Sequence, residues 1–298
     1  MCGIIGLLVK KTEDRASLGE WLAPMMVCMN ERGPDSAGLA VFSQSLTRQH
    51  QFSLFSTHPH IDFADLAARF TRETGVPCDV EVVDHRAVLT AACERTTFSA
   101  WMAEAYPTVR VLAAGHSIRM FKDVGAPKAL VERYGVGSFS GSHAVGHTRM
   151  ATESAVSPAH AHPFTAGEDF CLVHNGSLSN PYSLRRRLER KGIRFETDND
   201  TEAACRFLEW RMREGDTLEQ AIEKAFEELD GFYTLLMATP TRMVLVKDAF
   251  ACKPAVVAET DDYVAVASEF RSLAHLPGVE EAELFEPRPQ TIYSWSVQ

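Results

Sequence analysis

The sequence has few of the features that would place it at a membrane or on a nucleic acid. Its 298 residues contain no apolar run long enough to span a bilayer, and the N-terminal segment lacks the pattern of a signal peptide. The net charge is −10, and no stretch gathers Lys and Arg beyond Arg185-Arg186-Arg187, which disfavours a nucleic-acid surface. We therefore expect a cytoplasmic protein that binds neither nucleic acid nor membrane.

Cysteine pairs are missing as well. The seven cysteines include no Cys-x-x-Cys spacing, which disfavours a zinc or iron–sulfur site, and their odd number disfavours a disulfide framework. Internal repeats and low-complexity tracts are also absent. A hydrophobic content of 45% is ample for a packed core, so we expect a globular fold.

The most informative feature that is present is the second residue. Cys2 becomes the N-terminal residue once the initiator Met1 is removed. The reference pKa values of a cysteine thiol and a chain α-amine lie within about one unit of each other. The amine can therefore take the thiol's proton and leave a nucleophilic thiolate. The alternative is an ordinary small residue at the start of a strand, because Ile4-Ile5 and Leu7-Leu8-Val9 form an apolar run.

The spacing of apolar residues predicts an α+β fold. Many strands joined by short loops, with few helices, favour antiparallel sheets covered by helices over repeated βαβ units. Residues 43–142 are harder to organise, and we expect an inserted α/β subregion there, within a single domain covering 1–298. We predict helices near 18–29, 63–74, 87–92, 201–213 and 217–229, and strands near 4–9, 37–42, 80–83, 109–113, 144–148, 170–174, 232–238, 242–247, 254–258, 263–267 and 291–295.

Three polar clusters follow at predicted strand ends and loops. They are Gly146-His147-Thr148-Arg149-Met150-Ala151-Thr152, His174-Asn175-Gly176-Ser177-Leu178-Ser179-Asn180 and Thr197-Asp198-Asn199-Asp200-Thr201-Glu202. Together with Cys2 and Arg32-Gly33-Pro34-Asp35-Ser36-Ala37-Gly38, their order resembles the class II glutamine amidotransferases, which are N-terminal-nucleophile hydrolases. The resemblance implies a four-layer αββα sandwich of two antiparallel sheets. It also implies hydrolysis of glutamine to glutamate and ammonia.

The chemistry of glutamine indicates what each cluster would do. A site that selects glutamine needs a cation for the carboxylate, an anion for the ammonium and an oxyanion hole beside the nucleophile. We expect Arg149 to hold the carboxylate, although it could be a surface arginine in a salt bridge. We expect Asp200 to bind the ammonium, and it could also cap the helix that begins at Thr201. Asn175 and Gly176 are the candidate oxyanion-hole donors, although Asn-Gly is also a common hairpin turn.

The resemblance alone supplies three further assignments. It places Thr152 near the substrate carboxylate. It places Arg32, together with Asp35, in the loop that closes over bound glutamine, although a turn that simply ends a helix would need no such role. It also favours Asp200 over Asp198, because the family has its acidic residue directly before Thr-Glu.

Released ammonia is wasted unless another protein captures it. The sequence leaves no room for a synthase domain, so we expect a synthase-type partner subunit and a hetero-oligomer. The resemblance is to the separate amidotransferase subunits of glutamate-synthase-like complexes, including those that make N-methylglutamate. It implies a partner that carries a flavin and an iron–sulfur cluster, and no cofactor in this chain.

Three other functions stay open. The chain could bind glutamine or glutamate as a gating subunit with little hydrolysis of its own. It could be a self-cleaving acylase or peptidase of the same superfamily, although Cys2 needs only Met removal. It could also be a metal-dependent hydrolase, but we expect no metal because an acidic third ligand is missing. The histidines that raise this last possibility are His143, His147, His160, His162 and His174.

Overall fold

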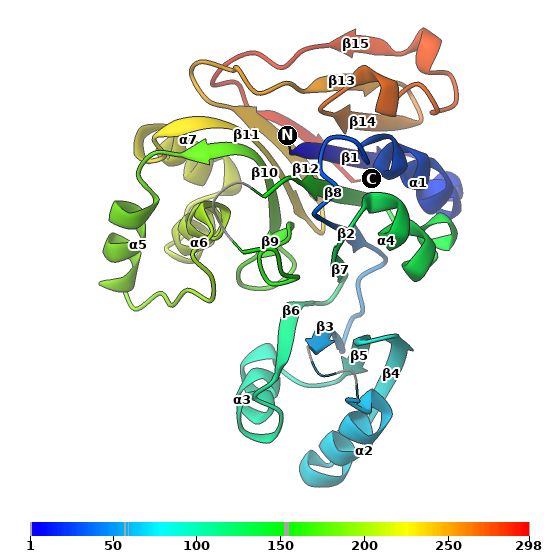
Figure 1. Cartoon of the computed structure of the whole chain (residues 1–298), viewed down its shortest axis with the longest axis vertical. Helices are drawn as coiled ribbons and strands as arrows, with labels where there is room; N and C mark the ends of the chain where they lie inside the picture. The colour runs from blue at the N-terminus through cyan, green and yellow to red at the C-terminus, as the bar shows by residue number, and fades with distance from the viewer. Residues whose placement is uncertain (1, 57, 59, 152–154, 298) are drawn as a thin grey trace.

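The computed structural model describes residues 2–56, 58, 60–151 and 155–297. Two antiparallel sheets lie face to face at its centre, and helices cover the outer face of each sheet (Figure 1). This is the α+β, four-layer αββα arrangement that the motifs predict. Within the described residues, every helix is too short or too polar to cross a bilayer.

The two central sheets contain most of the strands. In spatial order the larger sheet contains β15 (Glu283–Phe285), β13 (Val256–Glu259), β14 (Tyr263–Ala267), β1 (Gly3–Val9), β8 (His143–Arg149), β2 (Ser36–Phe42) and β7 (Ile118–Val124). The smaller sheet contains β16 (Tyr293–Ser296), β12 (Arg242–Lys247), β11 (Gly231–Thr239), β10 (Cys171–Leu178) and β9 (Phe164–Thr165). The strand that follows Cys2 therefore lies inside its sheet, between β14 and β8.

A core of apolar side chains fills the space between the sheets. Ile4 and Leu8 of β1 belong to it, together with Val173 of β10 and Leu236 of β11. Alternate residues of β1 point to the other face and pack under helices, because side chains alternate along a strand. Burial of both faces explains why this segment is a nearly continuous apolar run in the sequence.

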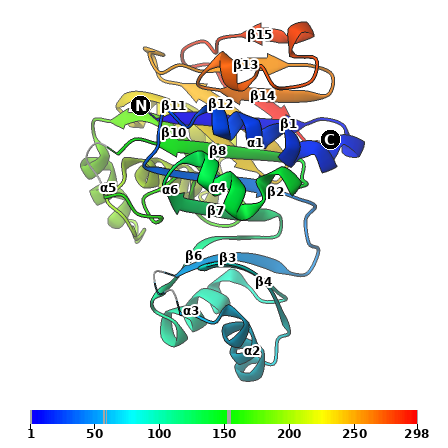
Figure 2. The same ribbon diagram turned by 45° about the vertical axis from the view of Figure 1, so that its right-hand side comes forward.

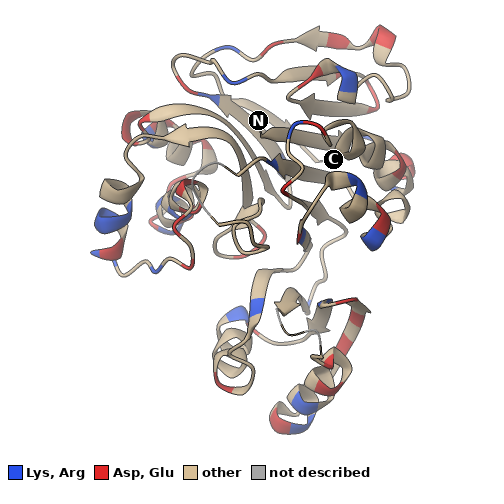
Figure 3. Cartoon of the chain, in the orientation of Figure 1, with Lys and Arg blue, Asp and Glu red and all other residues tan. Residues whose placement is uncertain are grey.

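Helices form the two outer layers. The larger sheet is covered by α1 (Leu18–Cys28) and α4 (Pro127–Tyr134), and the smaller by α5 (Pro181–Glu189), α6 (Asp200–Arg213) and α7 (Leu218–Glu228). Charged residues lie mainly on helices and loops at the outside, whereas the central strands contain few of them (Figure 3). The capping box of Thr217 and Gln220 starts α7, as expected for a helix with this N-terminal sequence.

A third sheet builds a separate inserted lobe, defined here as residues 50–115. Its strands, in spatial order, are β4 (Cys78–Val83), β5 (Arg86–Ala91), β3 (His50–Ser56) and β6 (Val109–Gly115), and its helices are α2 (Phe63–Thr74) and α3 (Arg95–Ala105). The lobe has its own core around stacked Phe52 and Phe98, with Phe70 beside them. Figures 1 and 2 show it extending from the body below β7.

Several sequence expectations for this region differ from the structure. The segment 87–92 was expected to be helical, and this is wrong, because it is strand β5, paired on both sides by β3 and β4. A short apolar run fits either state, and here the cross-strand partners decide it. The expected insertion at 43–142 also includes β7 and α4, which belong to the larger sheet and its helical layer. The division into one domain with an insertion stays a prediction.

Candidate active site

Most of the site residues predicted from the sequence line one cavity. Its volume is about 670 Å³, and it opens where β1, β8 and β10 meet the start of α6. An amino acid fits easily into such a volume. The nominated residues that line it are Cys2, Arg32, Arg149, Asn175, Gly176 and Asp200. Thr152, the remaining nominated residue, lies outside the described residues.

Cys2 is held at the edge of the larger sheet by both neighbouring strands. In the antiparallel pair of β1 and β8, Gly3 lies opposite Thr148, so the next step of the same register places Cys2 across from Arg149. On the other side, the Ile4 amide donates to Ser268 Oγ at 2.9 Å. The Cys2 Sγ atom lies 3.9 Å from the Met150 carbonyl oxygen. Sheet pairing thus fixes the thiol beside the end of β8.

Arg32 holds the backbone of the nucleophile. Its Nε donates to the Cys2 carbonyl at 3.1 Å, and its guanidinium pairs with Glu269 at 2.6 Å. Arg271 pairs with the same carboxylate at 2.5 Å. Burial alone would raise the pKa of Glu269, but its hydrogen bonds and charge interactions with Arg32 and Arg271 outweigh this and lower the pKa. The sequence did not predict this chain of contacts from Glu269 to Cys2.

Arg149 ends β8 inside the protein. Only 5% of the Arg149 surface is exposed, so the alternative of a surface arginine is wrong. The guanidinium donates to the Ala155 carbonyl at 2.9 Å. Asp35 holds the backbone on both sides of Met150. The Asp35 amide donates to the Arg149 carbonyl, and the Asp35 carboxylate accepts from the Ala151 amide at 2.9 Å. Asp35 therefore anchors the start of the segment that leads to Thr152.

Asn175 and Gly176 lie within β10, and the hairpin-turn alternative is wrong. They pair with Thr234 and Tyr233 of β11 in a continuous antiparallel register. Gly176 has φ of 153°, and a Cβ there would lie 1.9 Å from the Phe232 carbonyl oxygen, so only glycine fits. The Nδ2 atom of Asn175 is buried and has no hydrogen-bond partner among the described residues. Such a donor is available to a ligand.

Three buried histidines connect the nucleophile's sheet to the smaller sheet. His147 on β8 donates through Nε2 to the His174 carbonyl on β10 at 2.9 Å. His162 and His174 both contact Thr201 Oγ1, at 2.8 and 2.9 Å. Burial lowers the pKa of His147 to about 3 and lowers those of His162 and His174, which keeps the rings neutral near pH 7. These contacts fix the position of Asn175 relative to Cys2.

The histidines between 143 and 174 give little support to the metal-hydrolase alternative. His143 contacts Ser142 and the Thr239 carbonyl, and His160 contacts Ser157 and Asp198. In the described part of the chain, none of these five histidines belongs to a group of three or more ligand side chains close enough to share one ion.

Asp200 begins α6, and the expected capping role falls to its neighbour. Asn199 is the N-cap, because its Oδ1 accepts from the Thr201 amide at 2.9 Å. The Asp200 carboxylate instead accepts from the Leu178 amide at 2.9 Å and lines the cavity at the helix N-terminus, which favours a negative charge. Asp198 is more exposed and pairs with His160 at 3.0 Å.

Comparison with known proteins decides the family. The glutamine amidotransferase domain family matches residues 147–275. The glutamine amidotransferase-like protein GlxB of Rhizobium meliloti is 48% identical over 299 residues, which cover 100% of this chain and 99% of that protein. The chain belongs to the glutamine amidotransferase family. Membership of this family supports amidotransferase activity.

Solved structures show that the chain has the fold of class II glutamine amidotransferases. The allosteric regulatory enzyme of purine biosynthesis aligns with a TM-score of 0.62 and 19% identity, covering 98% of this chain and 46% of that one. The glutamine phosphoribosylpyrophosphate amidotransferase of B. subtilis aligns with a TM-score of 0.59 and 19% identity, covering 99% and 49%. The chain thus spans about half the length of these two enzymes.

The cavity around Cys2 is also lined by residues that the sequence did not predict. Lys253 and Cys252 line it from the segment after β12, and Tyr182 lines it from α5 with 71% of its surface exposed. None of the sequence motifs described above includes Lys253 or Cys252, so the sequence provided no signal for either residue. Cys252 places a second, exposed thiol on the same cavity as Cys2.

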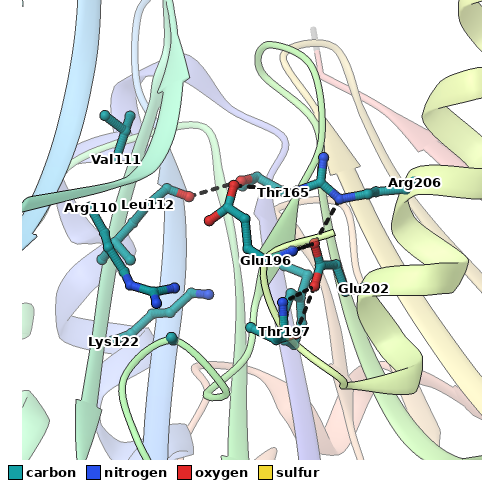
Figure 4. A pocket seen from close by; sticks show the side chains of 11 residues that line it. Arg110, Val111, Leu112, Lys122, Thr165, Glu196, Thr197, Glu202 and Arg206 are labelled. Atoms are coloured by element: carbon teal, nitrogen blue, oxygen red, sulfur yellow. Dashed lines mark hydrogen bonds and ion pairs between the residues drawn. The ribbon is translucent and has the colours of Figure 1, made fainter. Parts of the chain in front are cut away.

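A second cavity lies between the lobe and the body of the protein (Figure 4). Lys122 and Arg110 point into it from one side, and Glu196, Glu202 and Arg206 face them. Burial lowers the pKa of Lys122 to about 8. The volume of about 50 Å³ is too small for glutamine, and the cavity shares no lining residue with the one around Cys2.

Proposed function

We propose that this chain is a glutaminase subunit that uses Cys2 as its N-terminal nucleophile. The observation that carries the proposal is the joint placement of Cys2, Arg149, Asn175, Gly176 and Asp200 around one cavity of amino-acid size. These residues come from four distant parts of the sequence. Packing of the fold alone gives no reason for a thiol, a cation and an anion to line the same cavity as an amide donor that has no partner among the described residues.

The charged ends of glutamine match the two sides of this cavity. Arg149 binds the α-carboxylate with two parallel hydrogen bonds, a geometry that lysine cannot reproduce. Asp200 accepts from the α-ammonium at the N-terminus of α6. Thr152 completes the carboxylate contact, and Arg32 holds the Cys2 backbone in place as the loop closes. The side-chain amide of glutamine then lies at the Cys2 thiol.

The reaction proceeds in two steps. The Cys2 thiolate attacks the amide carbon, and the oxyanion accepts hydrogen bonds from Asn175 Nδ2 and the Gly176 amide. The α-ammonium of Cys2 donates a proton to the leaving nitrogen, the carbon–nitrogen bond breaks, and ammonia leaves behind a γ-glutamyl thioester. The α-amine next takes a proton from water, and the hydroxide attacks the thioester. Glutamate leaves and the thiol is restored.

The ammonia passes to a synthase-type partner in a cytoplasmic hetero-oligomer, of the glutamate-synthase or N-methylglutamate-synthase kind. The chemistry above needs no cofactor in this chain, and the partner supplies any flavin and iron–sulfur cluster. Two exposed aromatic residues support a docking role. Tyr182, which lines the cavity, is 71% exposed, and Phe250, two residues before the lining residue Cys252, is 72% exposed.

The test is glutamine hydrolysis by the purified chain, alone and with its partner. We expect ammonia release that Cys2→Ala abolishes and that Cys252→Ala leaves unchanged, since both thiols line the cavity but only Cys2 can be N-terminal. Equal activity of Cys2→Ala and the unaltered protein would overturn the proposal. Saturable glutamine binding without hydrolysis, with and without the partner, would identify the gating subunit instead.

A further inference from the structure

The chain carries a group of metal-ligand side chains outside the machinery assigned above. Among the described residues, His50, His116 and Glu168 present ligand atoms that all lie within 4.8 Å of one another. None of the three lines the cavity around Cys2. We propose that this group binds one divalent transition-metal ion, with zinc as the best match, and that the ion fastens the inserted lobe to the body.

The two histidines face each other because of strand pairing. In the β3 and β6 ladder Gln51 lies opposite Gly115, so the next step of this register sets His50 opposite His116. Side chains directly opposite each other in an antiparallel pair stand on the same face about 5 Å apart. Their ring centroids lie 4.0 Å apart. The pair is therefore built into the register of the sheet.

The carboxylate comes from the body. Glu168 lies in the connection between β9 and β10, and its Oε2 is 3.4 Å from His50 Nε2. The next residue, Asp169, holds the opposite segment by accepting from the amides of His116, Ser117 and Ile118 at 2.7 to 2.9 Å. Because Glu168 and Asp169 are adjacent, these bonds also fix the distance between Glu168 and His116.

One imidazole is already oriented as a ligand. His116 Nδ1 donates to the Gln49 carbonyl at 2.9 Å, which leaves Nε2 as the coordinating atom. Metal-binding histidines in proteins usually donate their other N–H to a backbone carbonyl or carboxylate. Two imidazoles and a carboxylate with an open fourth position suit zinc, at ligand distances of about 2.0–2.2 Å. Glu168 is 38% exposed and can move by the small amount that closure needs.

The position of the group gives the ion a structural role. His50 starts the first strand of the lobe, and His116 lies on the return segment between β6 and β7. Both segments cross from the lobe to the body, as Figures 1 and 2 show. An ion held by both crossings and by Glu168 would restrain the lobe. A histidine–glutamate ion pair beside a second, tilted imidazole ring is the competing explanation, and it predicts no specific metal affinity.

The test uses the untagged full-length chain after treatment with a chelator. Zinc is titrated against a competing chromophoric chelator, and cobalt is added to a second sample to read its visible spectrum. We expect one zinc per chain, and at least about tenfold weaker binding in Glu168→Gln and in His116→Gln, since even loss of an orienting contact costs about 10- to 100-fold. The control is His60→Ala, which removes an exposed lobe histidine outside the group.

The results separate the two explanations. Tight zinc binding that falls in both ligand variants but not in His60→Ala, with a cobalt spectrum of nitrogen and oxygen ligands, supports the site. Binding that is absent in the unaltered chain, or equal in all variants, overturns it. An intense thiolate-to-cobalt band also overturns it, because the ion would then lie on a cysteine. Circular dichroism of each variant identifies any loss caused by unfolding.

Discussion

Replacing Asn175 with Ala should lower turnover sharply and leave the fold about as stable as before. The residue is 5% exposed, and its Nδ2 donor has no partner among the described residues. A buried donor without a partner costs about 1–3 kcal/mol, so its removal offsets the packing lost with the carboxamide. We expect the free energy of unfolding to change by no more than about 1 kcal/mol, a shift of about 2–4 °C in Tm.

The effect on catalysis should be much larger. Loss of one oxyanion-hole donor costs about 2.7–4 kcal/mol, which is about a 100- to 1,000-fold fall in kcat. KM for glutamine should change little, because the lost hydrogen bond strengthens only as negative charge develops on the oxygen. A side chain with a purely structural role would give the reverse pattern, a lower Tm with nearly normal kcat.

Steady-state ammonia release and thermal unfolding measure the two quantities on the same samples. The matched control is Ser177→Ala, which changes an exposed residue on the same strand and the same cavity and should alter neither quantity. The reasoning is refuted if Asn175→Ala keeps kcat within threefold of the unaltered enzyme. It is equally refuted if kcat falls only in proportion to the unfolded fraction.

Three further changes test other parts of the account. Arg149→Lys should lower kcat/KM about 10- to 100-fold, mainly through KM, because one charge-assisted hydrogen bond worth about 1.5–3 kcal/mol is lost; an unchanged KM would remove Arg149 from the substrate site. Glu269→Gln should loosen Arg32 from the Cys2 carbonyl and lower kcat by up to about 100-fold at unchanged KM, whereas a pure loss of Tm would make the contact structural. Burial lowers the pKa of His143 to about 4. Between about pH 6.5 and pH 4, this histidine is therefore protonated in the unfolded chain but neutral in the folded chain. Acidification through this range destabilises the fold. His143→Phe should therefore reduce the slope of unfolding free energy against pH by up to about 1.4 kcal/mol per unit, measured by denaturant titration, and an unchanged slope would contradict this.

Much of the fold was predictable from apolar patterns. The strands near 232–238, 242–247 and 263–267 and the helix near 217–229 are confirmed as β11, β12, β14 and α7. These segments are long or bounded by clear turn and capping signals. The segment 87–92 is short and has no clear turn or capping signal at its ends. Its pairing with the neighbouring strands β3 and β4 makes it a strand. Strand β3 was missed, because His50-Gln51-Phe52-Ser53 mixes polar and aromatic residues.

The assembly of the site was less accessible to sequence reasoning. The order of the motifs predicted Cys2, Arg149 and Asp200 as site residues. Their spacing along the chain does not predict that they line one cavity. That follows from the pairing of β1 with β8 and from the packing of β10 against them. The support that Glu269 gives to Arg32 joins residues 237 positions apart, and it depends on the same sheet. Asn199 and Asp200 both have side chains that can cap a helix, so the sequence alone does not decide which of them is the N-cap.

The most direct test of the account is mass spectrometry of the N-terminal peptide, taken from active protein quenched with acid during glutamine turnover. The account predicts a peptide that begins at Cys2 and carries a γ-glutamyl group on its thiol, and predicts that this adduct is absent from Cys2→Ala. Active protein that retains Met1 would contradict the account, because the proposed base would not exist. An adduct on Cys252 in place of Cys2 would contradict it as well.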